Sequence, residues 1–120
     1  MLENISSILT EKCGLNRELP LIAGVSGGPD SLCLLDVLRK AGYRIIVAHF
    51  NHKLRPDSDT DANIVEHTAA RLNIASVIQS GDVRGFAEAR KLSIEEAARI
   101  LRYRFLMEQA RHFRAQAVAV

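Results

Sequence analysis

The architecture of this chain is set by one stretch, the apolar run Leu19-Pro-Leu-Ile-Ala-Gly-Val25 and the turn Ser26-Gly-Gly-Pro-Asp-Ser31 that follows it. A short run that is apolar at successive positions is typical of a strand buried on both faces of a parallel sheet. The segment from Asp30 to Ala41 is rich in leucine and long enough for a helix, which Gly42 can end. The stretch therefore predicts a strand, a glycine-rich loop and a helix in immediate succession.

The rest of the chain repeats this alternation. Apolar runs predict further strands, and apolar residues at helical spacing predict the helices between them. The predicted helices cover residues 2–12, 30–41, 57–72, 86–92 and 94–114, and the predicted strands cover residues 19–25, 44–49, 74–79 and 117–120. Strand–helix–strand units imply a Rossmann-like, doubly wound parallel sheet with helices on both faces. A sheet of this kind binds its ligand at the carboxyl ends of its strands.

Composition excludes several classes of protein. The chain has 120 residues and a net charge of +2, which suits one globular domain and does not by itself mark a nucleic-acid-binding protein. No apolar run approaches the roughly 20 residues of a membrane-spanning helix, so we expect no membrane association. Cys13 and Cys33 are too few for a disulfide scaffold and favour a reducing, cytoplasmic setting. Arginines cluster between Arg99 and Arg114, which suits an anionic partner or a solvated helix face.

The loop from Ser26 to Ser31 has the chemistry of a phosphate-binding site. Gly27 and Gly28 permit positive φ angles and leave no Cβ to obstruct a ligand. Successive backbone amides can then point into one concavity, and the helix start adds free N–H groups and a positive dipole end. The hydroxyls of Ser26 and Ser31 can donate hydrogen bonds to phosphate oxygens.

Asp30 is the exceptional member of this loop, because a carboxylate repels phosphate. It fits as a cap on the following helix, or as a ligand of a Mg²⁺ ion that bridges the phosphates. A plain tight turn capped by Asp30 is the simpler alternative, since Gly-Gly-Pro-Asp is common turn chemistry. The loop is neither a Walker A motif nor a dinucleotide fingerprint, because Gly-Lys-Ser/Thr and G-x-G-x-x-G are both absent.

The pattern Ser26-Gly-Gly-x-Asp-Ser31 resembles the pyrophosphate loop of the PP-loop ATP pyrophosphatases, whose sheets are adenine nucleotide alpha hydrolase-like. The segments His49-Phe-Asn-His-Lys-Leu-Arg55, Ser93-Ile-Glu-Glu-Ala-Ala-Arg99 and Leu101-Arg-Tyr-Arg-Phe-Leu106 resemble the tRNA(Ile)-lysidine synthase family. That resemblance implies an enzyme that binds ATP and Mg²⁺ and adenylates the wobble cytidine of tRNA(Ile) with a CAU anticodon. L-lysine then displaces AMP to form lysidine. The base has to be exposed for this, which suits an unpaired loop nucleotide.

The resemblance also implies roles for individual residues. It implies that the pyrophosphate of ATP is held by Ser26, Gly27, Gly28, Pro29, Asp30 and Ser31, with Asp30 near Mg²⁺. His49 and Phe50 are implied to seat the adenosine. Arg102 is implied to act in catalysis together with Asp30, because a guanidinium can stabilise the α-phosphate as it becomes pentacoordinate. Arg55 is a further candidate for a phosphate or tRNA contact.

Several of these residues also have plainer interpretations. His49 and His52 are spaced like metal ligands, but no third ligand is in view, so we expect a structural or adenosine-proximal role for both. Ser93 and Glu96 form a capping box, which leaves Glu95 freer for function.

Other residues are expected in the hydrophobic core. We predict that Tyr103, Met107 and Phe113 are core residues rather than base-stacking platforms. Cys33 is predicted to be a small buried hydrophobe within its helix.

We interpret residues 1–120 as the N-terminal portion of one incomplete PP-loop ATP-binding domain, since the last predicted strand ends where a functional loop should begin. This portion is expected to be inactive alone, and the edge of its last strand can pair with a second copy to give a homodimer. One alternative is a tRNA-thiolating PP-loop enzyme, which uses cysteines placed for sulfur transfer or for an iron–sulfur cluster. Another alternative is a non-catalytic ATP-binding module. Formation of AMP and pyrophosphate separates either enzyme from the module.

Overall fold

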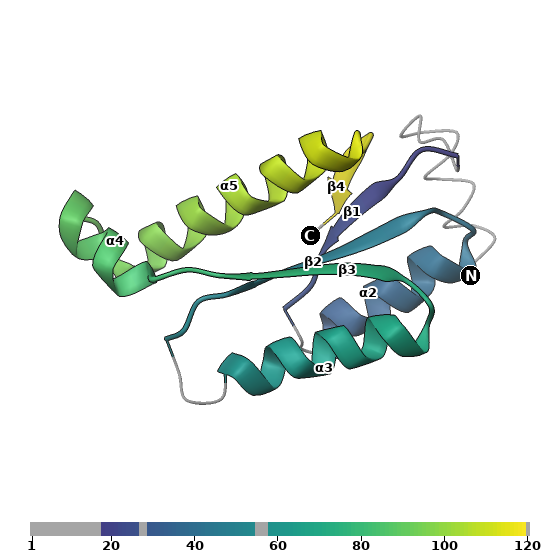
Figure 1. The fold of residues 1–120 in the computed structure, drawn as a ribbon, viewed down its shortest axis with the longest axis horizontal. Coiled ribbons are helices and arrows are strands. Elements are labelled where there is room, and N and C mark those ends of the chain that lie inside the picture. The colour runs from purple at the N-terminus through teal and green to yellow at the C-terminus, as the bar shows by residue number, and fades with distance from the viewer. Residues whose placement is uncertain (1–17, 27–28, 55–57, 120) are drawn as a thin grey trace.

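The computed structural model describes residues 18–26, 29–54 and 58–119, in which a sheet lies between two layers of helices (Figure 1). The elements are β1 (Leu21–Gly24), α2 (Pro29–Lys40), β2 (Ile45–Asn51), α3 (Ser58–Arg71), β3 (Ala75–Ser80), α4 (Val83–Arg90), α5 (Ile94–Phe113) and β4 (Ala117–Ala119). The predicted alternation is confirmed from β1 onward, while the helix predicted over residues 2–12 lies outside the described residues. No described helix is long and apolar enough to cross a membrane.

The strands are parallel and lie in the order β3-β2-β1-β4. Leu21 of β1 is opposite Ile45 of β2 on one side and opposite Ala117 of β4 on the other. The direction of winding therefore reverses at β1, and in such sheets ligands bind outside the carboxyl ends of the strands at the reversal. This is the predicted doubly wound fold. β4 is an edge of the described sheet, and the homodimer through that edge stays a prediction.

Helices cover both faces of the sheet, α2 and α3 on one and α4 and α5 on the other (Figure 1). Successive residues of β1 alternate between these layers: Leu21 and Ala23 pack with α2 and α3, whereas Ile22 packs with α4 and α5. All three are at most 1% exposed. The run around β1 is apolar at consecutive positions because each face of the strand meets its own core.

Local chemistry explains where the helices end. Gly42 follows α2 with a φ of 89°, a conformation that glycine adopts without a steric penalty. α5 begins after Ser93, whose Oγ accepts a hydrogen bond from the Glu96 N–H at 3.1 Å. This contact is the first half of the predicted capping box.

The short helix α4 begins at Val83, earlier than the predicted Phe86. The reason is Asp82, whose carboxylate accepts a hydrogen bond from the Gly85 N–H at 3.0 Å and so caps the helix. From the sequence, Ser80-Gly-Asp82 is expected only to break the preceding strand, and the capping role of Asp82 was not predicted.

Three residues predicted to be buried are exposed. Tyr103 is 52% and Met107 49% exposed on α5, and Cys33 is exposed on α2. α5 packs on the sheet through the side that carries the buried Phe105 and Leu106, and Tyr103 and Met107 lie outside this contact. Phe113 packs partly buried against the core, as predicted.

Gly81 lies against a ring that also lines the cavity described below. A Cβ at this position would lie 2.5 Å from Cζ of Phe50. The Phe50 ring is itself confined, with ring centroids 5.8 Å from Phe105 and 5.2 Å from His52. Gly81→Ala is therefore expected to destabilise the fold by about 1–3 kcal/mol, measured by urea unfolding.

The shorter side chain in Phe50→Leu removes the atom that clashes. The double variant Gly81→Ala/Phe50→Leu is therefore expected to lose less stability than the two single losses combined. Strictly additive losses would show that the clash with Phe50 is not the cause.

Candidate nucleotide site

A cavity of about 440 Å³ opens at the carboxyl ends of β1 and β2. Residues 24–26 and 48–52 form its wall at the strand ends, and Ser31 contributes from α2. α3 adds Asp61, and α5 adds Arg102 from across the sheet. The cavity thus lies at the edge where a doubly wound sheet binds its ligand.

Two hydroxyls bracket the predicted phosphate loop at this cavity. Ser26 and Ser31 both line it, and their Oγ atoms share a hydrogen bond of 3.0 Å. The loop glycines, residues 27–28, lie outside the described residues. Pro29 and Asp30 begin α2, so the free N–H groups of that helix start at the cavity. The side chain of Asp30 is outside the described part of the structure, and its contact with Mg²⁺ stays a prediction.

His49 brings a buried hydrogen-bond acceptor to this cavity. The side chain is 5% exposed, and its Nδ1 lies 2.6 Å from the carbonyl oxygen of Val25. A carbonyl can only accept, so Nδ1 carries the hydrogen, and Nε2 of the neutral ring is an acceptor. Nε2 is buried and has no partner among the described residues. A bound ligand with an amino or hydroxyl donor would satisfy it.

His52 follows β2 and stands beside the same cavity. Its ring meets the Phe50 ring edge-on at a centroid distance of 5.2 Å. Burial, the positive charge of Arg102 and nearby His49 lower the pKa of His52 below the ordinary histidine value. Its ring is therefore neutral at pH 7. Its Nδ1 is buried without a partner among the described residues.

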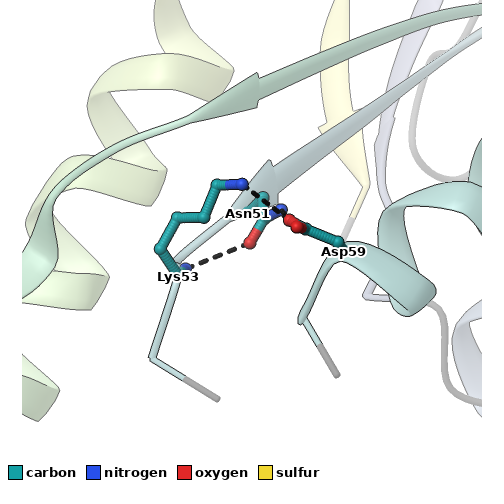
Figure 2. Close-up of polar contacts among 3 residues, drawn as sticks. All are labelled: Asn51, Lys53 and Asp59. Carbon is teal, nitrogen blue, oxygen red and sulfur yellow. Dashed lines mark hydrogen bonds and ion pairs between the residues drawn. The ribbon is translucent and has the colours of Figure 1, made fainter. Parts of the chain in front are cut away.

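The residues on either side of His52 are tied to the start of α3 (Figure 2). Nδ2 of Asn51 and Nζ of Lys53 both donate to Oδ1 of Asp59, at 2.8 and 2.6 Å. The Lys53 N–H also donates to Oδ1 of Asn51 at 3.0 Å, and Lys53 has a φ of 57°. These donors, the Lys53 and Asn51 side chains, hold the pKa of Asp59 below its usual value. We call Asn51, Lys53 and Asp59 the Asp59 clip.

A second cavity, of about 580 Å³, lies along the first turns of α5. Glu95, Arg99 and the exposed Tyr103 line it, so it has charges of both signs and an aromatic ring. His52 and Arg102 line both cavities. The two cavities therefore meet at these two side chains.

The structure brings five of the predicted site residues together. Ser26, Ser31, His49, Phe50 and Arg102 line one cavity, although they come from separate elements of the chain. The remaining predictions concern residues 27–28, the side chains of residues 29–30 and Arg55, all outside the described part.

Sequence reasoning missed the Asp59 clip and assigned His52 no catalytic role. The available signal was the run of polar residues from Asn51 to Lys53 directly after a buried strand, which is where this fold places its ligand. The hydrogen bonds from Asn51 and Lys53 to Asp59 depend on how α3 returns to the sheet, which the sequence does not show.

Comparison with known proteins identifies the family. A family model described as a PP-loop domain matches residues 2–120. The tRNA(Ile)-lysidine synthase of Dehalococcoides mccartyi is 37% identical, over 98% of this chain and 26% of its own length. That of Thermus thermophilus is 39% identical, over 82% of this chain and 20% of its own length. The chain thus spans about a fifth to a quarter of the length of these relatives.

The fold also matches that of a solved enzyme. The structure of NMN synthetase from Francisella tularensis superposes with a TM-score of 0.72 at 20% identity, covering 97% of this chain and 51% of that one. This similarity shows a shared fold. Since the family model extends over nearly all of the sequence, the chain belongs to the PP-loop domain family, an ATP-binding family.

Proposed function

We propose that this chain is the nucleotide-binding part of a tRNA(Ile)-lysidine synthase, which joins lysine to the wobble cytidine of tRNA(Ile) at the expense of ATP. The observation that carries the proposal is the convergence of Ser26, Ser31 and Arg102 on one cavity of a PP-loop domain. The relatives of that name, similar over most of this chain, support the choice of reaction. A cytoplasmic location belongs to the same proposal.

The described residues suit an adenine nucleotide. The hydroxyls of Ser26 and Ser31 and the N-terminus of α2 would hold the phosphates. The unpartnered Nε2 of His49 would accept a hydrogen bond from the adenosine, and the Phe50 ring adds an apolar wall. Asp30 would hold Mg²⁺, which offsets phosphate charge when it is bound.

Arg102 would assist the first chemical step. The C2 oxygen of the cytidine bonds to the α-phosphorus of ATP, and pyrophosphate leaves. Negative charge builds on the α-phosphate oxygens in the transition state, and a guanidinium on the cavity wall stabilises it. In the second step the ε-amine of lysine bonds to C2, the C2–O bond breaks, and AMP leaves with that oxygen.

The proposed function is tested with the full-length protein. It is incubated with ATP, Mg²⁺, labelled L-lysine and a tRNA(Ile) transcript bearing CAU, and both AMP and label on the tRNA are followed. We expect both products in equal amounts. AMP without label on the tRNA would keep the ATP pyrophosphatase and overturn lysine as the nucleophile. ATP binding with neither product would favour the non-catalytic module.

The phosphate loop is tested by binding. Ser26→Ala and Asp30→Ala are each expected to raise the Kd for ATP·Mg²⁺ about 10-fold or more, because each removes a contact to a charged group. Titration calorimetry measures the change. Unfolding midpoints without ATP should stay near the parent value, since these side chains serve the ligand.

Ser76→Ala is the matched control, because Ser76 is exposed on β3 away from the cavity. It is expected to bind ATP as the parent does. Parent-like ATP affinity in both loop variants would show that the loop does not hold the phosphates.

A further inference from the structure

His52 and Arg102 are the side chains that line both cavities. The first cavity is lined by Ser26 and Ser31 of the predicted phosphate loop. The second cavity lies along α5 and is lined by neither of these serines. A group transfer from ATP to a second substrate needs the reacting atoms of both where their sites meet. His52 therefore stands where the substrates of such a reaction would come into contact.

The second step of the proposed reaction needs a proton acceptor at that place. A lysine ε-amine has an ordinary pKa of about 10.4, so at neutral pH it is an ammonium without a free electron pair. It must lose a proton before it can attack carbon. A neutral imidazole is the side chain best matched to this task near pH 7. The second cavity also holds carboxylates, but these are weaker bases because their ordinary pKa values lie near 4.

We propose that His52 removes the proton from the attacking lysine ε-ammonium, and that the Asp59 clip positions it for this step. The freed electron pair forms the C–N bond at C2 while the C2–O bond breaks and AMP leaves. Since Nδ1 is buried, Nε2 is the ring nitrogen that takes the proton, and this requires the neutral tautomer that has its hydrogen on Nδ1. The inference rests on the proposed function, because it requires an amine nucleophile.

The position of His52 is held from several sides. Its chain neighbours Asn51 and Lys53 are both hydrogen-bonded to Asp59, and the Phe50 ring packs against its own. Asp59 is not among the residues that line the second cavity, so it is a positioning residue that acts through the backbone on either side of His52.

The surroundings keep the ring in its base form. Besides His52, the charged and titratable groups of the two cavities come from β2, α3 and α5 and are His49, Asp61, Glu95, Glu96, Arg99, Arg102 and Tyr103. Burial disfavours a positive charge on His52, and the charge of Arg102 and the nearby His49 disfavour it further. The pKa of His52 is thus lowered, so its base form predominates at pH 7 and is lost as the pH falls through that lowered pKa.

The test separates the two chemical steps in full-length His52→Gln. Adenylation is followed as pyrophosphate released without lysine, and transfer as label gained when lysine is added to the adenylated tRNA. We expect adenylation within about 3-fold of the parent and transfer slower by about 100-fold or more. The exposed His67 of α3 supplies the matched control His67→Gln, in which both steps stay normal.

Two further readouts are specific to proton removal. The defect of His52→Gln should shrink as the pH rises toward the pKa of lysine, because the free amine then forms without a base. Hydroxylamine, a nucleophile that is unprotonated at neutral pH, should react equally with the adenylated tRNA on parent and variant. Asp59→Asn is expected to slow lysine transfer more than adenylation. Its transfer defect should also shrink as the pH rises, by a smaller factor than that of His52→Gln.

Each contrary result is distinct. Equal losses in both steps, a defect that does not change with pH, or a defect that persists with hydroxylamine would overturn the role of His52. Normal transfer by a folded His52→Gln protein would do the same. If the parent protein forms no lysidine, the proposed function itself fails, and this is seen before any variant is compared. His52→Asn repeats the test if His52→Gln unfolds at a lower urea concentration.

Discussion

Replacing Arg102 with alanine is expected to slow adenylation by about 10²–10³-fold while ATP binds with nearly unchanged affinity. The guanidinium lines the cavity that holds the phosphate-loop serines, where it can meet charge that builds on the α-phosphate. Loss of one such stabilising donor costs a factor of this size, because it acts mainly in the transition state. Single-turnover release of pyrophosphate measures the rate, and titration calorimetry measures the affinity.

Two substitutions sharpen this test. Arg102→Lys keeps the charge but not the forked geometry, so it should recover only part of the rate. Arg111→Ala removes an exposed arginine from the last turn of the same helix, outside both cavities, and should leave the rate unchanged. Adenylation at the parent rate in Arg102→Ala would refute the catalytic role.

The loss of Arg102 should also be felt in the second step. Its positive charge helps to lower the pKa of His52, so in Arg102→Ala that pKa rises. A larger share of His52 is then protonated near neutral pH and cannot accept a proton. The lower limit of the pH range for lysine transfer should move upward, which a pH profile of the transfer step detects.

Replacing Phe105 with alanine is expected to cost about 3–5 kcal/mol of folding free energy. Phe105 is 2% exposed and packs with Ile22 of the central strand and with the Phe50 ring. Removal of the ring leaves a void between α5 and the sheet that rigid neighbours cannot close. The loss is a large part of the roughly 5–15 kcal/mol typical of a domain, so the urea midpoint should fall sharply.

Phe86→Ala is the matched control for size and chemistry. Phe86 is partly buried and lies beneath the guanidinium groups of Arg90 and Arg104, at 5.3 and 5.4 Å from its ring centre. Its removal should cost less than half as much, because solvent can fill part of the space. Equal losses in the two variants would show that α5 is not anchored through Phe105.

The two largest effects are linked through α5. Arg102 and Phe105 lie within one turn of this helix, the first at the cavity and the second in the core. Packing of Phe105 therefore helps to fix the position of Arg102 at the cavity that Ser26 and Ser31 line. A milder core change, Phe105→Leu, should keep most of the stability and still lower the adenylation rate more than ATP affinity.

Much of the fold was predictable because its signals are local. The consecutive apolar residues of β1 predict a strand buried on both faces. The residues from Ser26 to Ser31 predict a turn followed by the start of a helix. Ser93 indicates the start of α5, because its hydrogen bond with Glu96 joins residues that are close in the sequence. Helix periods, caps and turns depend on neighbours in the chain, so the order of elements and the loop follow from the residues alone.

The remaining features depend on contacts between distant parts of the chain. The sequence predicts Tyr103 of α5 in the core, and only packing on the sheet decides that Phe105 is buried and Tyr103 is exposed. The packing of α5 on the sheet brings Arg102 to the cavity that Ser26 and Ser31 line. The return of α3 brings Asp59 within hydrogen-bond distance of Asn51 and Lys53, the residues on either side of His52. Periodicity specifies how residues are spaced along an element but not which face of it meets another. The segment from Ser26 to Ser31 could therefore be predicted as a phosphate loop from its residues, whereas the junction of the two cavities exists only in the folded domain.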